Sequence, residues 1–148
     1  MIRVQEGDFD IGAEVERLKR GRKDVGAVVA FVGAVRDQAG DSEIEAMTLE
    51  HYPGMTEHEL ARIEAEAHAR WPLLDSLIVH RTGRMLAGEN IVLVVTLSAH
   101  RQAAFEAAQF LMDYLKTKAP FWKREETSSG SRWVAARESD EREAGRWR

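Results

Sequence analysis

The sequence contains no cysteine. Disulfide bonds, thiolate metal sites and a cysteine nucleophile are therefore excluded together, and the lack of cysteine is consistent with a cytoplasmic protein. The chain also lacks an apolar run long enough to cross a bilayer, and residues 1–6 lack the basic and then apolar pattern of a signal peptide. These absences predict a cytoplasmic protein without a membrane partner.

Signs of metal or nucleic-acid chemistry are few. The five histidines show no H-x-x-x-H or similar ligand spacing, so we expect no metal site and no cofactor. The formal net charge of -4 and the isoelectric point near 5.8 disfavour general nucleic-acid binding, which usually needs a broad basic face.

The length of 148 residues is that of one ordinary domain. A hydrophobic content of 44% can fill a core, and 31% charged residues can cover it. The chain shows no internal repeat, low-complexity segment or linker. We therefore expect one domain over residues 1–148, with a charged tail from about residue 138.

Hydrophobic periodicity predicts helices and strands in a mixed order. The first helix is capped by Asp10 and stopped by Gly21, the second runs from Thr56 to Trp71-Pro72, and the third is capped by Ser98 and runs to about Lys118. Strands are predicted over residues 26–33, 44–51, 77–81, 91–97, 121–126 and 132–135, and a loop over residues 34–41. This order predicts an α+β fold with two hairpins.

A basic cluster stands out from the acidic chain. Lys116, Lys118, Lys123 and Arg124 lie within nine positions, and the apolar residues 120–122 between them indicate partial packing. Packed cations repel each other and lose hydration, so they usually face an anion. The alternative is a helix that ends in lysines, which suit the negative end of the helix dipole.

The third predicted helix places one lysine of this cluster beside apolar residues. Its predicted apolar stripe consists of Phe105, Ala108, Met112 and Leu115. Lys116 leaves one edge of the stripe, and such a lysine can act as a base or nucleophile because burial favours its neutral form. A structural lysine whose stem covers apolar surface is the alternative, although the neighbouring cations favour the functional interpretation.

Two further positions are candidates for anion binding. His100 and Arg101 begin the third helix, where a bound phosphate or carboxylate would use free backbone N–H groups; an exposed arginine paired with an acid is the alternative. Arg36 follows a buried strand at an exit where functional residues often lie, but pairing with Asp37 explains it equally well. The residues predicted as plain strand and helix surface are His80, Arg81, Glu50, Glu64 and Glu66.

Several blocks of the sequence together resemble one known family. The blocks are residues 26–36, 49–55, 98–101 with 104–107, and 115–125, followed by Trp133-Val134. In this order, without a large gap, they resemble the molybdopterin synthase catalytic (large) subunit family. Ungapped blocks in the right order are far more specific than any single motif.

The resemblance implies a function and an assembly. The family acts as a sulfurtransferase that converts cyclic pyranopterin monophosphate (precursor Z) into molybdopterin, in molybdenum cofactor biosynthesis. Sulfur arrives as a thiocarboxylate on the C-terminal Gly-Gly of a small ubiquitin-like carrier subunit. The implied assembly is a heterotetramer around a central dimer of large subunits, and the implied fold is an α/β hammerhead with an additional small antiparallel sheet.

The resemblance also implies site residues. Lys116 would be the catalytic lysine with Lys123 beside it, and Lys116 could act in acid–base chemistry or form a covalent link. The residues implied in substrate binding are Ala34, Val35, Arg36, His100, Arg101, Lys116, Lys123, Arg124, Glu125 and, reaching across the dimer, Arg137.

Two other functions fit parts of the sequence. A non-catalytic module could use the same basic pocket to bind an anion or peptide. An RNA-binding domain would need exposed aromatic residues on a sheet and a basic face, for which only the cluster near Lys123 offers support.

Overall fold

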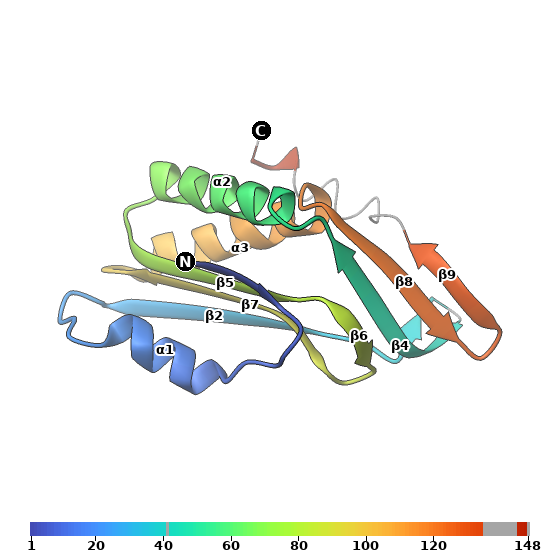
Figure 1. The fold of residues 1–148 in the computed structure, drawn as a ribbon. Helices are drawn as coiled ribbons and strands as arrows, with labels where there is room; N and C mark the ends of the chain where they lie inside the picture. Colours follow the sequence, from blue (N-terminus) through green and yellow to red (C-terminus); the bar gives the residue numbers. More distant parts are fainter. Residues whose placement is uncertain (41, 135–144, 148) are drawn as a thin grey trace.

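The computed structural model describes residues 1–40, 42–134 and 145–147, and it has the α+β fold that the sequence predicts (Figure 1). The helices are α1 (Ile11–Lys19), α2 (Met55–Arg70) and α3 (Arg101–Thr117). The strands are β1 (Ile2–Gln5), β2 (Ala27–Ala34), β3 (Gln38–Ala39), β4 (Ser42–His51), β5 (Leu73–Arg81), β6 (Gly83–Leu86), β7 (Asn90–Ser98), β8 (Phe121–Thr127) and β9 (Gly130–Val134). No helix in this described part is both long and apolar enough to span a membrane.

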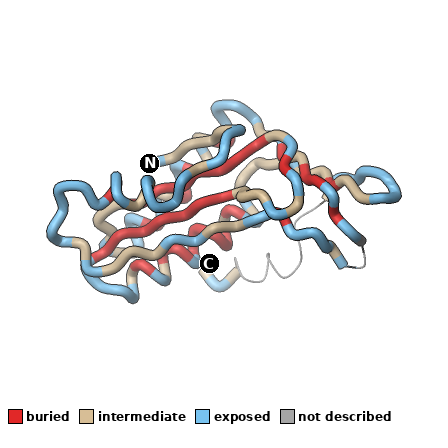
Figure 2. Tube along the Cα trace, turned by 90° about the horizontal axis from the view of Figure 1, so that it is seen from below, coloured by how far each residue is buried: buried red, intermediate tan, exposed pale blue. Residues whose placement is uncertain are grey.

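The main sheet has the strand order β1-β5-β7-β2, with α2 and α3 on one face and α1 on the other (Figure 1). β1 runs parallel to β5, and the other neighbours are antiparallel. Because side chains alternate along a strand, Ile78 packs toward α2 and α3, while Leu77 and Val79 pack with Leu18 of α1. The central strands are therefore buried on both faces, as Figure 2 shows in red.

A second, antiparallel sheet leaves one end of the main sheet (Figure 1). Its order is β3-β4-β8-β9, and β6 also pairs with β4. The chain passes from β5 into β6 at Gly83, whose φ of 88° lies in the left-handed region that favours glycine. The additional antiparallel sheet confirms the expected architecture, and its core is formed by Val35, Ile44, Met47, Leu49 and Met85.

The first two helices begin as the sequence predicts, within one residue. The Asp10 carboxylate accepts a hydrogen bond from the Ala13 N–H at 2.9 Å and caps α1. The Glu57 carboxylate accepts from the Gly54 N–H at 2.6 Å and satisfies a donor at the start of α2.

The prediction that Ser98 caps the third helix is wrong. Ser98 is the buried last residue of β7, and its hydroxyl donates to the carbonyl oxygen of His100. His100 occupies the N-cap position of α3 without a side-chain hydrogen bond. The predicted stripe of α3 also needs a correction, because Phe105 is 62% exposed while Ala108, Met112 and Leu115 are buried.

His80 and Arg81 were predicted at the surface, and both are buried. The Arg81 guanidinium donates to the carbonyl oxygens of Glu6 at 3.0 Å and Asn90 at 2.8 Å, so it ties the segment after β1 to the start of β7. The predicted loop over residues 34–41 contains the short strand β3, and β6 was not predicted.

Most of the predicted charged tail lies outside the described residues. Within 145–147, Trp147 packs against Trp71 and Phe110, and its indole N–H donates to the Asp113 carboxylate at 2.5 Å. Trp147 therefore lies against α2 and α3.

Candidate active site

A cationic cavity of about 410 Å³ lies between the segment after β2 and the hairpin β8-β9. Its lining residues are Arg36, Ala39, Gly40, Lys123, Glu125, Arg132 and Val134. Three of them are basic and one is acidic. The structure thus brings the predicted site residues Arg36, Lys123 and Glu125 together, although they are distant in sequence.

The register of the hairpin explains which side chains meet in this cavity. Lys123 pairs with Val134, and Glu125 pairs with Arg132. Alternation along the strands places these four side chains on one face of the hairpin. Arg124 points to the other face, where its guanidinium lies 5.8 Å from the centre of the Trp133 ring.

Glu125 is a deeply buried charged group of the cavity wall. It is only 5% exposed. Its carboxylate lies 3.8 Å from the Lys123 ammonium and 3.5 Å from the Arg132 guanidinium. A buried carboxylate needs such partners, and here it places two cations along one wall.

Lys116 lies at the end of α3, close to a buried histidine. Burial lowers the pKa of His80 to about 4; the carbonyl of Arg81 raises it, and the charges of Lys116 and His51 lower it further. The His80 Nδ1–H donates to the Arg81 carbonyl at 3.0 Å, so the neutral ring carries its lone pair on Nε2.

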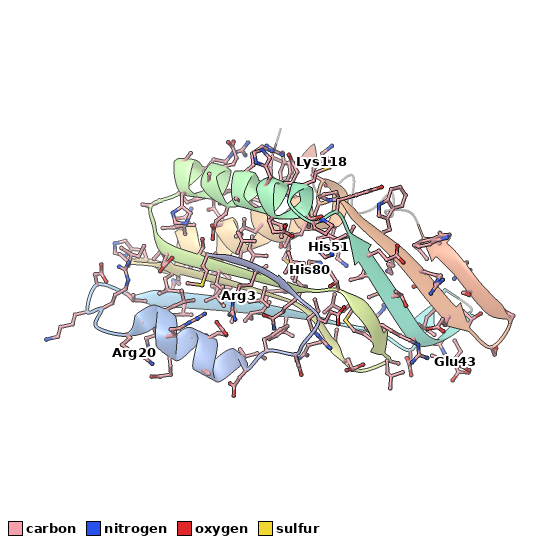
Figure 3. All side chains as sticks on the ribbon, viewed as in Figure 1. Arg3, Arg20, Glu43, His51, His80 and Lys118 are labelled. Carbon is pink, nitrogen blue, oxygen red and sulfur yellow. The ribbon has the colours of Figure 1, made fainter. Side chains whose placement is uncertain are left out.

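His80 also joins the end of α3 to the start of β8. Its ring stacks on Phe121 with 3.9 Å between the centroids. Phe121 pairs with His51 of β4, and Lys123 follows it on the same face of β8. Figure 3 shows His51 and His80 near the junction of the two sheets, and the charge of Lys116 acts on His80 there.

His100 and Arg101 are exposed at the opposite end of α3 from Lys116. Arg101 and Lys116 are fifteen positions apart, which corresponds to about 22 Å along the helix axis. One chain therefore keeps these predicted site residues apart. The start of α3 has no acidic residue in its first turn and no side-chain cap, which leaves its N–H groups available to an anion.

Ala34 and Val35 lead from β2 toward Arg36. Val35 is buried, its N–H donates to the Glu89 carbonyl at 2.9 Å, and its carbonyl accepts from the Gly88 N–H at 2.7 Å. A second hollow of about 540 Å³ is lined by Val35, Arg36, Asp37, Gln38, Ala87 and Gly88. Arg36 thus lines both hollows.

Two residues of this region were missed by sequence reasoning. Arg132 was only part of a predicted strand, and the register of that strand against residues 121–126 would have been needed to place it opposite Glu125. His80 sits in a run of buried residues, and its alternation with Ile78 is the signal that it faces the helices. Arg137 lies outside the described residues.

Within the described ranges, no group of three or more histidine or acidic side chains could hold a metal ion. The chemistry of the region is that of cations around one carboxylate, with a neutral imidazole and an exposed lysine nearby. Such a surface attracts oxyanions and offers amines for proton or acyl transfer.

Comparisons with known proteins point to one family. A family model described as MoaE protein matches residues 4–118. The chain is 57% identical to a molybdopterin synthase catalytic subunit from Mesorhizobium japonicum, over 99% of this chain and 92% of that protein.

Solved structures give the same picture. The fold is similar to that of a molybdopterin biosynthesis MoaE protein from Burkholderia ambifaria, with a TM-score of 0.85, 52% identity and coverage of 99% of this chain and 97% of the other. A molybdopterin synthase structure from Staphylococcus aureus is 31% identical with a TM-score of 0.82, over 90% of this chain and 96% of the other.

Proposed function

Because the chain belongs to the MoaE protein family, we propose that it is the catalytic subunit of a molybdopterin synthase. In this function it is a cytoplasmic sulfurtransferase of molybdenum cofactor biosynthesis. It takes sulfur from the C-terminal thiocarboxylate of a small ubiquitin-like carrier and transfers two sulfurs to precursor Z, which forms the dithiolene of molybdopterin.

The observation that carries this proposal is the cationic cavity lined by Arg36, Lys123 and Arg132. Lys123 and Arg132 pair with the buried Glu125 carboxylate, and Arg36 lines the same cavity. Both proposed reactants present negative groups to these cations: a cyclic phosphate and a thiocarboxylate. The chain has no cysteine, so it has no thiol with which to carry sulfur itself. A separate donor must therefore bring the sulfur.

The proposed roles follow from position. Lys116 is the catalytic residue and acts either as an acid–base group or through a covalent link to the reactants. Lys123, on the cavity wall, stabilises negative charge next to it. Each thiocarboxylate holds one sulfur, so one product with two sulfurs consumes two carriers.

A dimer of large subunits accounts for the divided set of site residues. His100 and Arg101 lie about 22 Å along α3 from Lys116, so one chain cannot place all three around one small substrate. We propose that the second copy in the central dimer contributes His100 and Arg101 to the site of the first. The carrier subunits complete the heterotetramer.

A reconstitution assay tests this function. The protein is mixed with precursor Z and a carrier whose C-terminus is a thiocarboxylate, and molybdopterin is measured as the product. A carrier that ends in an ordinary carboxylate is the control and should give none. The competing function, a non-catalytic anion- or peptide-binding module, predicts binding of both reactants without any product.

A further inference from the structure

The wall of the cationic cavity contains an arginine that no motif or resemblance assigns to the site. Arg132 lies on β9, in register with Glu125 of β8, and its side chain is 53% exposed. It lines the same cavity as Arg36 and Lys123. Its position therefore comes from the pairing of two strands, which turns its side chain toward the cavity.

Glu125 positions the Arg132 guanidinium but uses few of its N–H donors. The Arg132 Nη2 donates to the Glu125 carboxylate at 3.5 Å. Among the described residues, this is the hydrogen bond that the Arg132 guanidinium makes. A guanidinium has five N–H donors, and a single long bond leaves most of them for a ligand. The partner carboxylate is buried with a side-chain exposure of 7%, so its position is set by the strand.

The composition of the cavity indicates which ligand those donors bind. Three cations and one carboxylate line about 410 Å³, a volume that suits a small molecule. Cations on facing walls repel each other until an anion lies between them. An arginine can bind two oxygens of a phosphate through two parallel N–H bonds of its planar fork, whereas a lysine binds as a compact point charge.

We propose that Arg132 is a substrate-binding residue that binds the phosphate group of precursor Z, on the wall of the cavity that faces Arg36. This inference rests on the proposed function, because it names a residue for the substrate of that reaction. Arg132 acts on a charge that is present before and during the reaction. It therefore contributes to binding of precursor Z more than to the chemical step.

The test is steady-state kinetics of Arg132→Gln, with precursor Z varied at saturating thiocarboxylated carrier and then the carrier varied at saturating precursor Z. We expect KM for precursor Z to rise roughly tenfold or more, with kcat within about threefold and KM for the carrier unchanged. Arg132→Lys should recover part of the loss, because it keeps the charge without the fork.

Arg84→Gln is the matched control. Arg84 lies in the same sheet, is 59% exposed and pairs with Glu126 at 2.8 Å, but it does not line the cavity. It should leave both KM values unchanged. If Arg132→Gln lowers the melting temperature, Arg132→Lys gives the decisive comparison.

Three outcomes would overturn the inference: an unchanged KM for precursor Z, a loss confined to kcat, or a rise only in KM for the carrier. The last would assign Arg132 to the carrier's carboxylate and away from the phosphate. Failure of the proposed function looks different, because the unmodified protein would then form no molybdopterin at all. In that case, calorimetric titration of inorganic phosphate against the unmodified protein and Arg132→Gln tests the inference; equal binding would overturn it.

Discussion

At the scale of single residues, the candidate site combines exposed groups that can contact a reactant with buried groups that position them. Lys116 is exposed at the end of α3 and can reach a reactant, whereas His80 beneath it is buried and stays neutral. Glu125 is buried and holds Arg132 and Lys123 on one wall. The groups proposed to touch substrate are thus exposed or half-exposed, and those that orient them are packed.

Replacement of the exposed lysine should remove activity and spare the fold. We expect Lys116→Ala to reduce molybdopterin formation to near background, because it removes the amine whose charge acts on the buried His80 at the end of α3. The melting temperature should change by no more than about 2 °C, since substitutions at exposed positions cost little. Near-normal turnover would contradict the catalytic role.

The buried histidine predicts a pH dependence of stability. The pKa of His80 falls from 6.5 to about 4 on folding, so below pH 6.5 the unfolded chain binds a proton that the folded chain excludes. Its contribution to the free energy of unfolding is present above pH 6.5 and is lost as the pH falls toward 4, by at most about 3 kcal/mol.

His80→Phe keeps an aromatic ring against Phe121 and removes the titrating group. The free energy of unfolding of both proteins is measured in urea at pH 7 and at pH 4.5. Relative to the unmodified protein, the variant should be more stable at pH 4.5 than it is at pH 7. A difference that is the same at both pH values would show that His80 does not exclude a proton in the folded state.

At the scale of elements, α3 and β8 position the site. α3 carries Lys116 at one end and His100 and Arg101 at the other, and the β8-β9 register builds the cationic wall. The start of α3 is itself set by a close approach of backbones. The Gly26 N–H donates to the Ser98 carbonyl at 3.0 Å, just before Ala99 and His100.

The close approach of the Gly26 and Ala99 backbones predicts that a methyl group added at Gly26 strongly destabilises the fold. A Cβ on Gly26 would lie 2.0 Å from the Ala99 carbonyl oxygen, which is backbone and must move. We expect Gly26→Ala to lower the free energy of unfolding by about 2 kcal/mol or more and to weaken binding of precursor Z, because His100 and Arg101 follow Ala99.

Gly12→Ala is the control, since its Cβ would meet only the Asp10 carboxylate at an ordinary 3.6 Å within α1. Alanine favours a helix over glycine, so this variant should be as stable as the unmodified protein or more stable. Equal effects of both substitutions in urea unfolding would refute the close-approach argument.

At the scale of the whole molecule, the proposed site requires two copies of the chain, because Lys116 and Arg101 lie at opposite ends of α3. Co-expression of Lys116→Ala with Arg101→Glu tests this requirement. Each variant alone should be nearly inactive. If the site joins Lys116 of one copy to Arg101 of the other, each mixed dimer contains one intact site, and random pairing should restore roughly a quarter of the activity.

The alternative arrangement gives a different result. If Lys116 and Arg101 of one chain served the same substrate, every site in the mixture would carry a defect, and activity would stay at the level of the single variants. Size-exclusion chromatography of each variant checks that dimers form, so that a loss of assembly is not mistaken for a loss of the site.

Local patterns in the sequence were sufficient for much of the fold. Hydrophobic periodicity placed the three helices and six of the nine described strands, because the spacing of apolar side chains reflects the geometry of each element directly. The cluster from Lys116 to Glu125 was also visible as cations between packed residues. The sequence blocks along the chain identified the family, because a family match depends on residue types in their order along the chain.

Only the tertiary structure decided which of these residues meet. Strand register turned Arg132 toward Glu125 and Arg124 away from it, and His80 is buried with its ring stacked on Phe121 of β8. Serine is a favoured helix N-cap, so the sequence predicts that Ser98 caps the third helix. In the structure Ser98 is instead the last residue of β7. Pairing and burial depend on contacts between distant segments, and the separation of His100 from Lys116 depends on the length of a straight helix. Composition and spacing therefore determined the chemistry available to this chain, and packing determined where that chemistry is assembled.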